Sequence, residues 1–344
     1  MKTFLVTGGA GFIGSNFVHS VYRKYPDAKI LVLDLLTYAG SVDNLPKSNS
    51  KSQDERVEFW YGDIRNASLV DSLVARSDIV CHFAAETHVT RSIYDNHHFF
   101  ETDVLGTQVI ANSVLRHRDN VERFVHVSTS EVYGTALAEK MNEEHPLLPL
   151  SPYAGAKAGA DRLVYSYWAT YGIPAIIVRP FNNYGPRQHL EKLIPRFVTS
   201  CLLDEQLRVH GDGSAARDFL FVKDTCAAID LLAHAELDKV AGQVFNLGSS
   251  QHHSILDIAR IICKKMGKSE NIISYVGDRP GQVFRHTADC SKIQRMLGWE
   301  PSVPFDEGLD RTIAWYDDCR DWWRKQMWMR EIPIVTRSGQ REMH

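Results

Sequence analysis

The sequence has few of the patterns that would place a protein in a specialised class. Its six cysteines form no C-x-x-C pair and have no histidine at ligand spacing, so we expect no disulfide framework and no metal site. No apolar stretch reaches membrane-spanning length, and the N-terminus lacks a signal-peptide layout. The formal net charge of -3 predicts no nucleic-acid partner and no anionic membrane surface. We therefore expect a cytoplasmic protein with reduced, mostly buried thiols.

What is present is the alternation of an α/β protein. Hydrophobic residues make up 44% of the 344 positions and charged residues 24%, which is ordinary for a globular chain with a large core. Short β-rich runs alternate with longer amphipathic stretches, which predicts a Rossmann-type, doubly wound parallel sheet with helices on both faces. The expected strands are Phe4 to Thr7, Ile30 to Asp34, Val57 to Tyr61, Ile79 to Phe83, Phe124 to Val127 and Ala175 to Val178.

The strongest local signal lies at the N-terminus. Gly8, Gly11 and Gly14 are spaced by three residues directly after the first expected strand, and Asp34 ends the second. Such glycines let the backbone turn sharply and approach a pyrophosphate, while the N-terminus of the following helix offers N–H groups to the phosphates. An acid at position 34 would hold the ribose hydroxyls and repel a 2′-phosphate, so we expect NAD rather than NADP.

A second pattern indicates a candidate catalytic base. Tyr153 and Lys157 are four residues apart, on one face of a helix expected to begin near Ser151 and Pro152. A lysine ammonium beside a phenol stabilises the phenolate, so we expect Lys157 to lower the pKa of Tyr153 and make it a base for a sugar hydroxyl.

A hydroxyl-rich segment follows the fifth expected strand. Thr129 can hydrogen-bond a substrate oxygen, and Glu131 is a candidate for moving a proton. The carboxyl ends of parallel strands are where open α/β sheets bind ligands. We therefore expect Thr129, Ser130, Glu131, Tyr153 and Lys157 to form one catalytic group.

Ordered motifs along nearly the whole chain give a family resemblance. They include Leu36 to Gly40, Tyr61 to Ile64, Ala84 to Val89, Ser128 to Gly134, Ser151 to Lys157, Asn182 to Pro186, Glu191 to Pro195, Arg217 to Phe219, Phe245 to Gly248, Asp278 to Gly281 and Gly298-Trp299. The chain resembles the extended short-chain dehydrogenase/reductases that act on nucleotide sugars, and most of all the nucleotide-sugar 4,6-dehydratases.

The resemblance implies NAD as cofactor, a nucleoside-diphosphate sugar as substrate, and a role for each matching residue. Asp63 would meet the adenine amino group, and the Ala84-Ala85 turn would pass beside the cofactor. The implied cofactor-binding residues are Gly8, Gly11, Phe12, Ile13, Gly14, Asp34, Asp63, Ile64, Ala84, Ala85, Tyr153 and Lys157. The implied substrate-binding residues are His88, Asn182, Glu191, Lys192, Arg217, Asn246 and Arg285.

The resemblance also implies an organisation. We expect an NAD-binding domain over residues 1–180 that regains segments from about 215–250, a smaller substrate-binding lobe over residues 181–330, and a tail over residues 331–344. The tryptophans after Pro304 predict a helix docked by its aromatic face. Relatives usually dimerise through a four-helix bundle, so we expect a homodimer using the helices of residues 99–115 and 154–171.

Three positions depart from the dehydratase pattern. Ser130 stands where an aspartate is usual, Asp103 replaces an asparagine, and Thr90 replaces an aspartate. A serine hydroxyl cannot release a proton as a carboxylic acid can. We therefore predict that Glu131, alone or through water held by Ser130, both accepts the C5 proton of the sugar and assists departure of the C6 hydroxyl.

Other reactions stay open at this point. The Thr-Ser-Glu sequence also resembles that of UDP-glucuronate decarboxylases, whose reaction needs a cation beside C6, and Arg285 is the candidate. The same sequence occurs in dehydratases of nucleotide-linked N-acetylglucosamine, so the substrate can be of the dTDP-glucose type or of the UDP- or GDP-N-acetylglucosamine type. A 4-epimerase needs no Glu131, and a regulatory protein that binds NAD without turnover needs neither Glu131 nor Tyr153.

Overall fold

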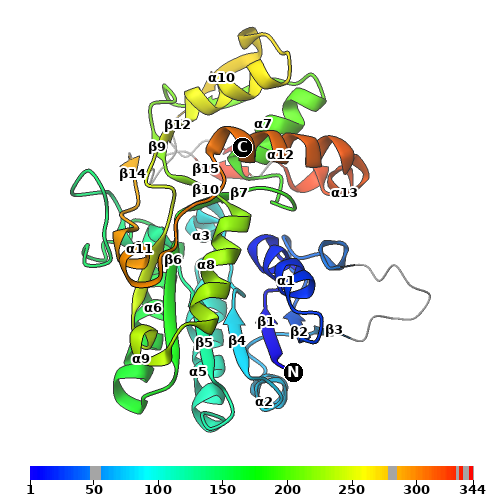
Figure 1. Cartoon of the computed structure of the whole chain (residues 1–344). Helices are drawn as coiled ribbons and strands as arrows, with labels where there is room; N and C mark the ends of the chain where they lie inside the picture. Colours follow the sequence, from blue (N-terminus) through cyan, green and yellow to red (C-terminus); the bar gives the residue numbers. More distant parts are fainter. Residues whose placement is uncertain (47–55, 278–284, 331–332, 336–340, 344) are drawn as a thin grey trace.

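The computed structural model describes residues 1–46, 56–277, 285–330, 333–335 and 341–343. Its larger part is built on a seven-stranded sheet in the order β11-β6-β5-β4-β1-β2-β3, in which every neighbouring pair is parallel (Figure 1). The strands are β1 Thr3–Thr7, β2 Lys29–Asp34, β3 Val57–Tyr61, β4 Ile79–His82, β5 Arg123–Val127, β6 Ala175–Pro180 and β11 Val244–Leu247. The doubly wound fold and all six expected strands are confirmed, while the seventh strand, β11, was not predicted as one.

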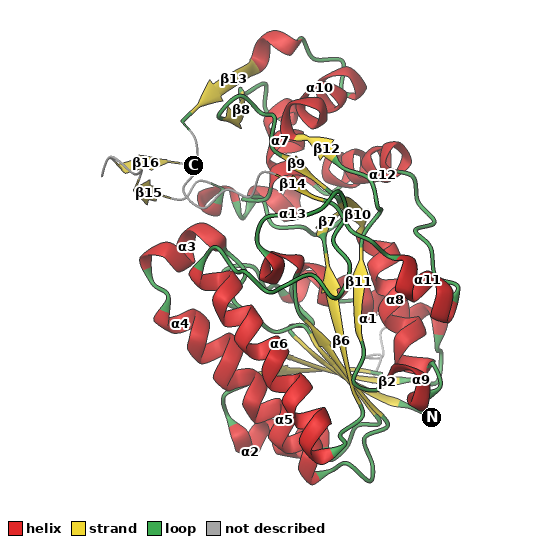
Figure 2. Ribbon diagram, turned by 90° about the vertical axis from the view of Figure 1, so that its left-hand side faces the viewer, coloured by secondary structure: helices red, strands yellow, loops and turns green. Residues whose placement is uncertain are grey.

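Alternate residues of each strand point to opposite faces of the sheet, and each face has its own core. In β1, Phe4 and Val6 pack towards α1 Phe12–Lys24 and α8 Val222–His234, whereas Leu5 packs towards the opposite face. That second face is covered by α2 Ala67–Val74, α5 Thr107–Arg116 and α6 Pro152–Tyr171 (Figure 2). Because the strands are covered on both sides, they read as continuous apolar runs.

A smaller lobe stands beyond the carboxyl ends of the strands, as Figure 2 shows. It has its own hydrophobic core, which includes Phe197, Ile258 and Leu309. The helices of this lobe are α7 Leu193–Leu202, α10 Ile255–Lys265, α12 Phe305–Asp318 and α13 Arg320–Arg324. Its strands are β7 Asn182–Tyr184, β8 Leu207–His210, β9 Ala216–Arg217, β10 Phe219–Phe221, β12 His253–Ser254, β13 Ile273–Val276 and β14 Arg285–His286.

The chain crosses between the two parts more than once. After the first strands of the lobe it returns through α8, which packs on α1, and through β11, which pairs with β6. A later segment also packs on the larger part: α11 Ser291–Leu297 lies against β11, and Ile293 and Trp299 join the core of α1 and α8. The sequence had assigned these residues to the lobe, because no strand pattern marks their return.

The aromatic C-terminal region docks largely as expected. Trp323 is fully buried, Trp315 and Trp322 pack against the core of the lobe, and Trp328 is exposed. The last described residues form a hairpin of β15 Pro333–Val335 and β16 Arg341–Met343.

Several further expectations concern the rest of the chain. The short helix η1 Val42–Asn44 follows β2, while residues 47–55 and the motif at 278–281 lie outside the described residues. All six cysteines are free and five are buried. None of the described helices is long and apolar enough to cross a membrane. The remaining elements are α3 Val89–Tyr94, α4 His97–Phe99, the π-helix η2 Phe100–Gly106, η3 Ser130–Tyr133, α9 Leu237–Val240, η4 Glu270–Ile272 and η5 Met327–Met329.

Candidate active site

One large cavity, of about 520 Å³, lies where the sheet faces the smaller lobe. Its floor comes from the segments that follow β1, β2, β4, β5 and β6, and its far wall from lobe residues such as Lys192 and Arg217. Parallel strands place all their carboxyl ends at one edge of the sheet, so residues far apart in sequence meet there. Nearly all the residues selected from the sequence line this cavity.

The glycine turn has the shape that its spacing predicts. Gly8 adopts a φ of +67°, and a Cβ on it would lie 2.5 Å from the backbone nitrogen of Ala84. A Cβ on Gly14 would lie 2.3 Å from the carbonyl oxygen of Gly8. A Cβ on Gly11 would meet only that same oxygen, at 3.2 Å. Gly8 and Gly14 are therefore required by the fold, whereas Gly11, at the start of α1, leaves the cavity side open for a ligand.

Two carboxylates border this end of the cavity. Asp34 accepts hydrogen bonds from the backbone nitrogens of Ala10, at 2.9 Å, and Leu36, at 2.8 Å, and burial raises its pKa. Burial acts in the same direction on Asp63, but its hydrogen bonds with Arg65 outweigh burial and lower the pKa. Both side chains are thus held in place at the ends of β2 and β3, beside Ile64.

Tyr153 and Lys157 lie in the first two turns of α6. The Ser151 hydroxyl accepts a hydrogen bond from the backbone nitrogen of Ala154, which caps the helix directly before Pro152. Lys157 is buried, and its Nζ donates to the carbonyl oxygen of Val127 at 2.8 Å. The helix start thereby fixes both side chains against the end of β5.

The electrostatics of Tyr153 differ from the expectation. We expected Lys157 to lower the pKa of the phenol, but burial raises that pKa well above its usual value. The group that lowers it is Thr129, through a side-chain hydrogen bond, while the charges of Asp103 and Glu131 raise it further. Lys157 does not lower the pKa of Tyr153 because its ammonium is directed to the backbone of Val127. Burial also lowers the pKa of Lys157 itself.

The hydroxyl-rich segment forms the short helix η3. Thr129 caps it, with its Oγ1 accepting a hydrogen bond from the backbone nitrogen of Glu131 at 3.3 Å. Ser130 is buried, and the Glu131 side chain is about one-quarter exposed, at 24%. Both residues line the cavity together with Tyr153, so the catalytic group proposed from the sequence is assembled in one place.

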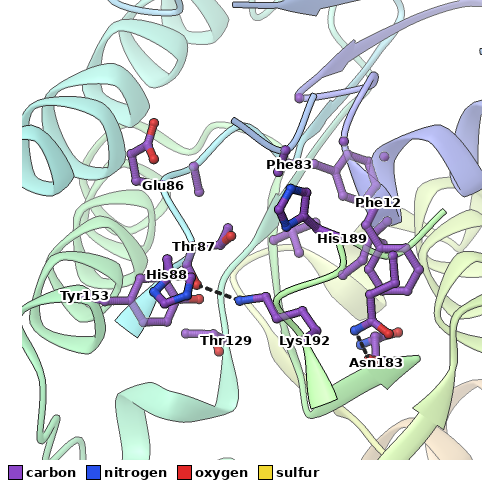
Figure 3. Close-up of a pocket in the computed structure, with 18 of the residues that line it drawn as sticks. Phe12, Phe83, Glu86, Thr87, His88, Thr129, Tyr153, Asn183, His189 and Lys192 are labelled. Atoms are coloured by element: carbon purple, nitrogen blue, oxygen red, sulfur yellow. Dashed lines mark hydrogen bonds between the residues drawn. The ribbon is translucent and has the colours of Figure 1, made fainter. Parts of the chain in front are cut away.

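The lobe contributes a buried ionic cluster centred on Glu191. Its carboxylate lies 3.2 Å from His88 Nε2 and 3.3 Å from Lys192 Nζ. Burial raises the pKa of this carboxyl, but the charges of Lys192, His88 and His189 outweigh burial and lower it. Figure 3 shows His88, Tyr153, Thr129 and Lys192 converging, with Lys192 Nζ donating to the carbonyl oxygen of Thr87 at 3.3 Å.

Two residues expected to bind substrate do not line the cavity. Asn246 is fully buried: its Oδ1 accepts from Tyr133 Oη at 2.7 Å and its Nδ2 donates to the carbonyl oxygen of Met141 at 2.9 Å. Arg285 donates through Nη2 to the carbonyl oxygen of Ala138 at 3.1 Å. Their side chains are committed to the protein itself, whereas Asn182 and Arg217 do line the cavity.

Sequence reasoning also passed over residues that the structure brings to the site. Glu86 and His189 line the cavity, and burial raises the pKa of Glu86 and lowers that of His189. Both lie within two or three residues of selected positions, so those motifs were the available signal. His286 comes within 4.0 Å of Glu131 and directly follows Arg285, a position that the sequence analysis had selected.

Comparisons with known proteins agree with this geometry. Residues 5–312 match the GDP-mannose 4,6 dehydratase family. A dTDP-glucose 4,6-dehydratase from Actinoplanes sp. is 43% identical over 324 residues, which span 93% of this chain and 99% of the relative. The low-salt glycan biosynthesis protein Agl12 of Haloferax volcanii is 44% identical over 312 residues, 91% of this chain and 97% of that protein.

Solved structures show the same similarity. DesIV, a dTDP-glucose 4,6-dehydratase from Streptomyces venezuelae solved with NAD bound, superposes with a TM-score of 0.88 at 41% identity, covering 94% of this chain and 99% of DesIV. The dTDP-glucose 4,6-dehydratase of Bacillus anthracis in complex with NAD gives 0.86 at 37% identity, covering 95% and 100%. The shared fold and the matches over nearly the full length lead to one conclusion: this chain belongs to the GDP-mannose 4,6 dehydratase family, within the extended short-chain dehydrogenase/reductases.

Proposed function

We propose that the protein is an NAD-dependent nucleotide-sugar 4,6-dehydratase, a lyase that makes a 4-keto-6-deoxy sugar nucleotide. The observation that carries the proposal is the meeting of Tyr153, Lys157 and Glu131 in one cavity with the Gly8–Gly14 turn. Relatives of the same length, more than 40% identical, are dTDP-glucose 4,6-dehydratases. The substrate is a nucleoside-diphosphate sugar, of the dTDP-glucose type or the UDP- or GDP-N-acetylglucosamine type.

The residues present fit NAD. Gly11 leaves room for a pyrophosphate at the start of α1, and Asp34 is held at the end of β2, where ribose hydroxyls would lie. Asp63 and the Ala84-Ala85 turn border the same part of the cavity. When bound, NAD accepts a hydride from C4 of the sugar and later returns it to C6.

The chain's own groups would move the protons. Tyr153 takes the proton of the C4 hydroxyl, helped by the hydrogen bond from Thr129 that lowers its pKa. The ketone formed at C4 acidifies the C5 hydrogen, and Glu131 accepts it as the C6 oxygen leaves. The buried Lys157 lies behind Tyr153, and the charge of Asp161 opposes the lowering of the Lys157 pKa by burial.

The lobe would hold the nucleotide end of the substrate. Lys192 and Arg217 are cations on the cavity wall, suited to the diphosphate oxygens. Asn182 lines the same wall, and the cluster of Glu191 with His88 offers acceptors and donors to sugar hydroxyls. Asn246 and Arg285 are left out of the proposed binding set because other parts of the protein occupy their side chains.

The competing reactions receive less support. Decarboxylation of a nucleotide-linked uronate was expected to use Arg285 as the cation beside C6, and Arg285 does not line the cavity. A UDP-glucose 4-epimerase from Thermotoga maritima has the same fold, with a TM-score of 0.84, but is only 27% identical. Epimerisation at C4 also requires no carboxylate at position 131.

The test is a panel of nucleotide sugars, with the masses of the products measured. Loss of one water supports the proposal, loss of carbon dioxide means decarboxylation, and an unchanged mass with altered stereochemistry means epimerisation. Glu131→Gln should abolish water loss while C4 oxidation persists, seen as accumulation of the reduced nicotinamide. Normal product formation by that variant would refute the role of Glu131.

We also propose a homodimer. The π-helix η2 and α6 pack on each other and expose Phe100, Leu105, Tyr165 and Tyr171, each of which is between 39% and 53% accessible. Two copies of this face would form a bundle of four helices and cover these side chains. A cytoplasmic location and the lack of a nucleic-acid partner stay predictions.

A further inference from the structure

His286 occupies an unusual position beside the proposed base. It lies in β14, its imidazole is fully buried, and its Nε2 is 2.6 Å from the carbonyl oxygen of Gly134. Because a carbonyl oxygen only accepts, Nε2 carries a hydrogen, and Nδ1 of the neutral ring is the free acceptor. Nδ1 makes no hydrogen bond within the described part of the chain and lies 4.0 Å from Glu131 Oε1.

Nδ1 of His286 is one of several buried side-chain atoms without a hydrogen-bond partner among the described residues, and it lies close to the proposed base. Buried polar atoms nearly always have a hydrogen-bond partner, and one without a partner lowers the stability of the fold. A catalytic role is one reason for a protein to keep such an atom. The hydrogen bond to Gly134 and the edge of Phe181, whose ring centre is 5.8 Å away, fix the orientation of the imidazole. The Nδ1 of His286 is therefore held 4.0 Å from the Oε1 of Glu131.

The pKa of His286 depends on the charge of Glu131 and of other groups around the imidazole. Burial lowers the pKa of His286, the Glu131 charge raises it, and Arg217 of β9 and His145 lower it. Arg217 also faces Glu131, whose charge raises the pKa of the guanidinium. The net effect lowers the pKa of His286, and the Glu131 charge is the main influence that opposes this lowering, so we treat Glu131 and His286 as a pair.

The reaction requires more protons to be donated than one carboxylate can supply. In the water-loss step the C5–H bond breaks, its electron pair forms the C5=C6 double bond, and the C6 oxygen leaves with the electrons of its own bond. The pair must accept the C5 proton and give one proton to the departing oxygen. When hydride returns to C6, C5 requires another proton. The balance is one proton accepted and two donated, and Ser130 cannot supply the difference at neutral pH.

We propose that His286 is a positioning residue and proton reserve for Glu131, so that the two together hold the proton that the carboxyl group missing at position 130 would have carried. The pair starts with one shared proton, takes the C5 proton through Glu131, and gives one proton to the C6 oxygen and one back to C5. It then recovers one proton from solvent, while Tyr153 releases the one taken from the C4 hydroxyl. This inference rests on the proposed dehydratase function.

Two variants separate this role from a structural one. His286→Gln places an amide nitrogen where Nε2 stood, so it keeps a donor for Gly134 but cannot carry the exchangeable proton of Nδ1. His286→Phe loses both. We expect each variant to reduce the rate of water loss at least about 100-fold while C4 oxidation, followed as reduced nicotinamide, changes less than about twofold. If His286 only holds Gly134, the glutamine variant will retain wild-type water loss, and the proposal is overturned.

The pH dependence of the unmodified enzyme gives an independent test. The rate of water loss should fall as the pH rises, because the proton shared by Glu131 and His286 is then lost; a flat profile contradicts the proposal.

The outcomes also distinguish a failure of the proposed dehydratase function from a failure of the proposed role of His286. If no nucleotide sugar loses water, the proposed function fails and the role of His286 fails with it. If water is lost normally and His286→Gln matches the wild type in rate and pH profile, only the role of His286 fails.

Discussion

Replacing Asp103 by asparagine should remove a loss of stability that the wild type shows as the pH rises. Asp103 is completely buried; its Oδ1 accepts a hydrogen bond from the backbone nitrogen of Glu86 at 2.8 Å, and its Oδ2 has no partner among the described residues. Burial raises its pKa from 3.8 to about 7, and Lys157 opposes the rise. The folded protein therefore keeps a proton on Asp103 that the unfolded chain has already released.

The sign and size of the effect follow from this proton. Between the unfolded pKa of 3.8 and the folded value of about 7, the folded state binds more protons at Asp103, so stability falls as the pH rises. The slope is about 1.4 kcal/mol per pH unit. Raising the pH from about 5 to about 8 crosses roughly two units of that window, so the wild type loses about 3 kcal/mol through this group. Asp103→Asn lacks the titration and should not show that loss.

Urea unfolding of both proteins at the two pH values measures the difference. The free energy of unfolding of the variant, relative to the wild type, should rise by about 3 kcal/mol from acid to alkaline pH, whatever the amide costs at either pH alone. Asp71→Asn is the matched control: hydrogen bonds from Arg116 and Ser113 outweigh its slight burial and lower its pKa below 3.8, so this carboxyl is ionised in the folded and unfolded chain at both pH values and its relative stability should not change. An unchanged difference for Asp103→Asn would show that the carboxyl is ionised in the fold, and the reasoning would be wrong.

Three further predictions concern the cofactor turn, the base and the dimer face. Gly14→Ala should destabilise the fold by about 1–3 kcal/mol in urea unfolding, since its Cβ would lie 2.3 Å from the Gly8 oxygen. Gly11→Ala should unfold like the wild type but bind NAD more weakly in a titration; equal affinity would place the pyrophosphate elsewhere. Tyr153→Phe should retain NAD binding and lose C4 oxidation at least about 100-fold, and undiminished oxidation would exclude Tyr153 as the base. Leu105→Glu should shift the protein to monomer mass in light scattering, and an unaltered mass would move the proposed interface off this face.

Local patterns predicted much of the fold and part of the site. The glycine turn, the acid at the end of β2 and the Tyr153–Lys157 spacing each depend on residues close in sequence and on one element of secondary structure. Such features can be recognised from the sequence alone, because their geometry is set by strand and helix periodicity. The seventh strand, β11, escaped prediction because it lies far along the chain from its neighbour β6.

The sequence by itself determined the doubly wound fold, the cofactor turn and the type of chemistry, since strand and helix periods and short motifs carry that information. Only the tertiary structure decided which side chains share the cavity. It buried Asn246 against Tyr133, turned Arg285 towards Ala138 and raised the pKa of Tyr153 where we expected it to fall. It also brought His286 to Gly134, 152 residues earlier in the chain, and so to Glu131. The reason is physical: burial and electrostatic interaction depend on distance in space, which distant segments acquire only when they pack together.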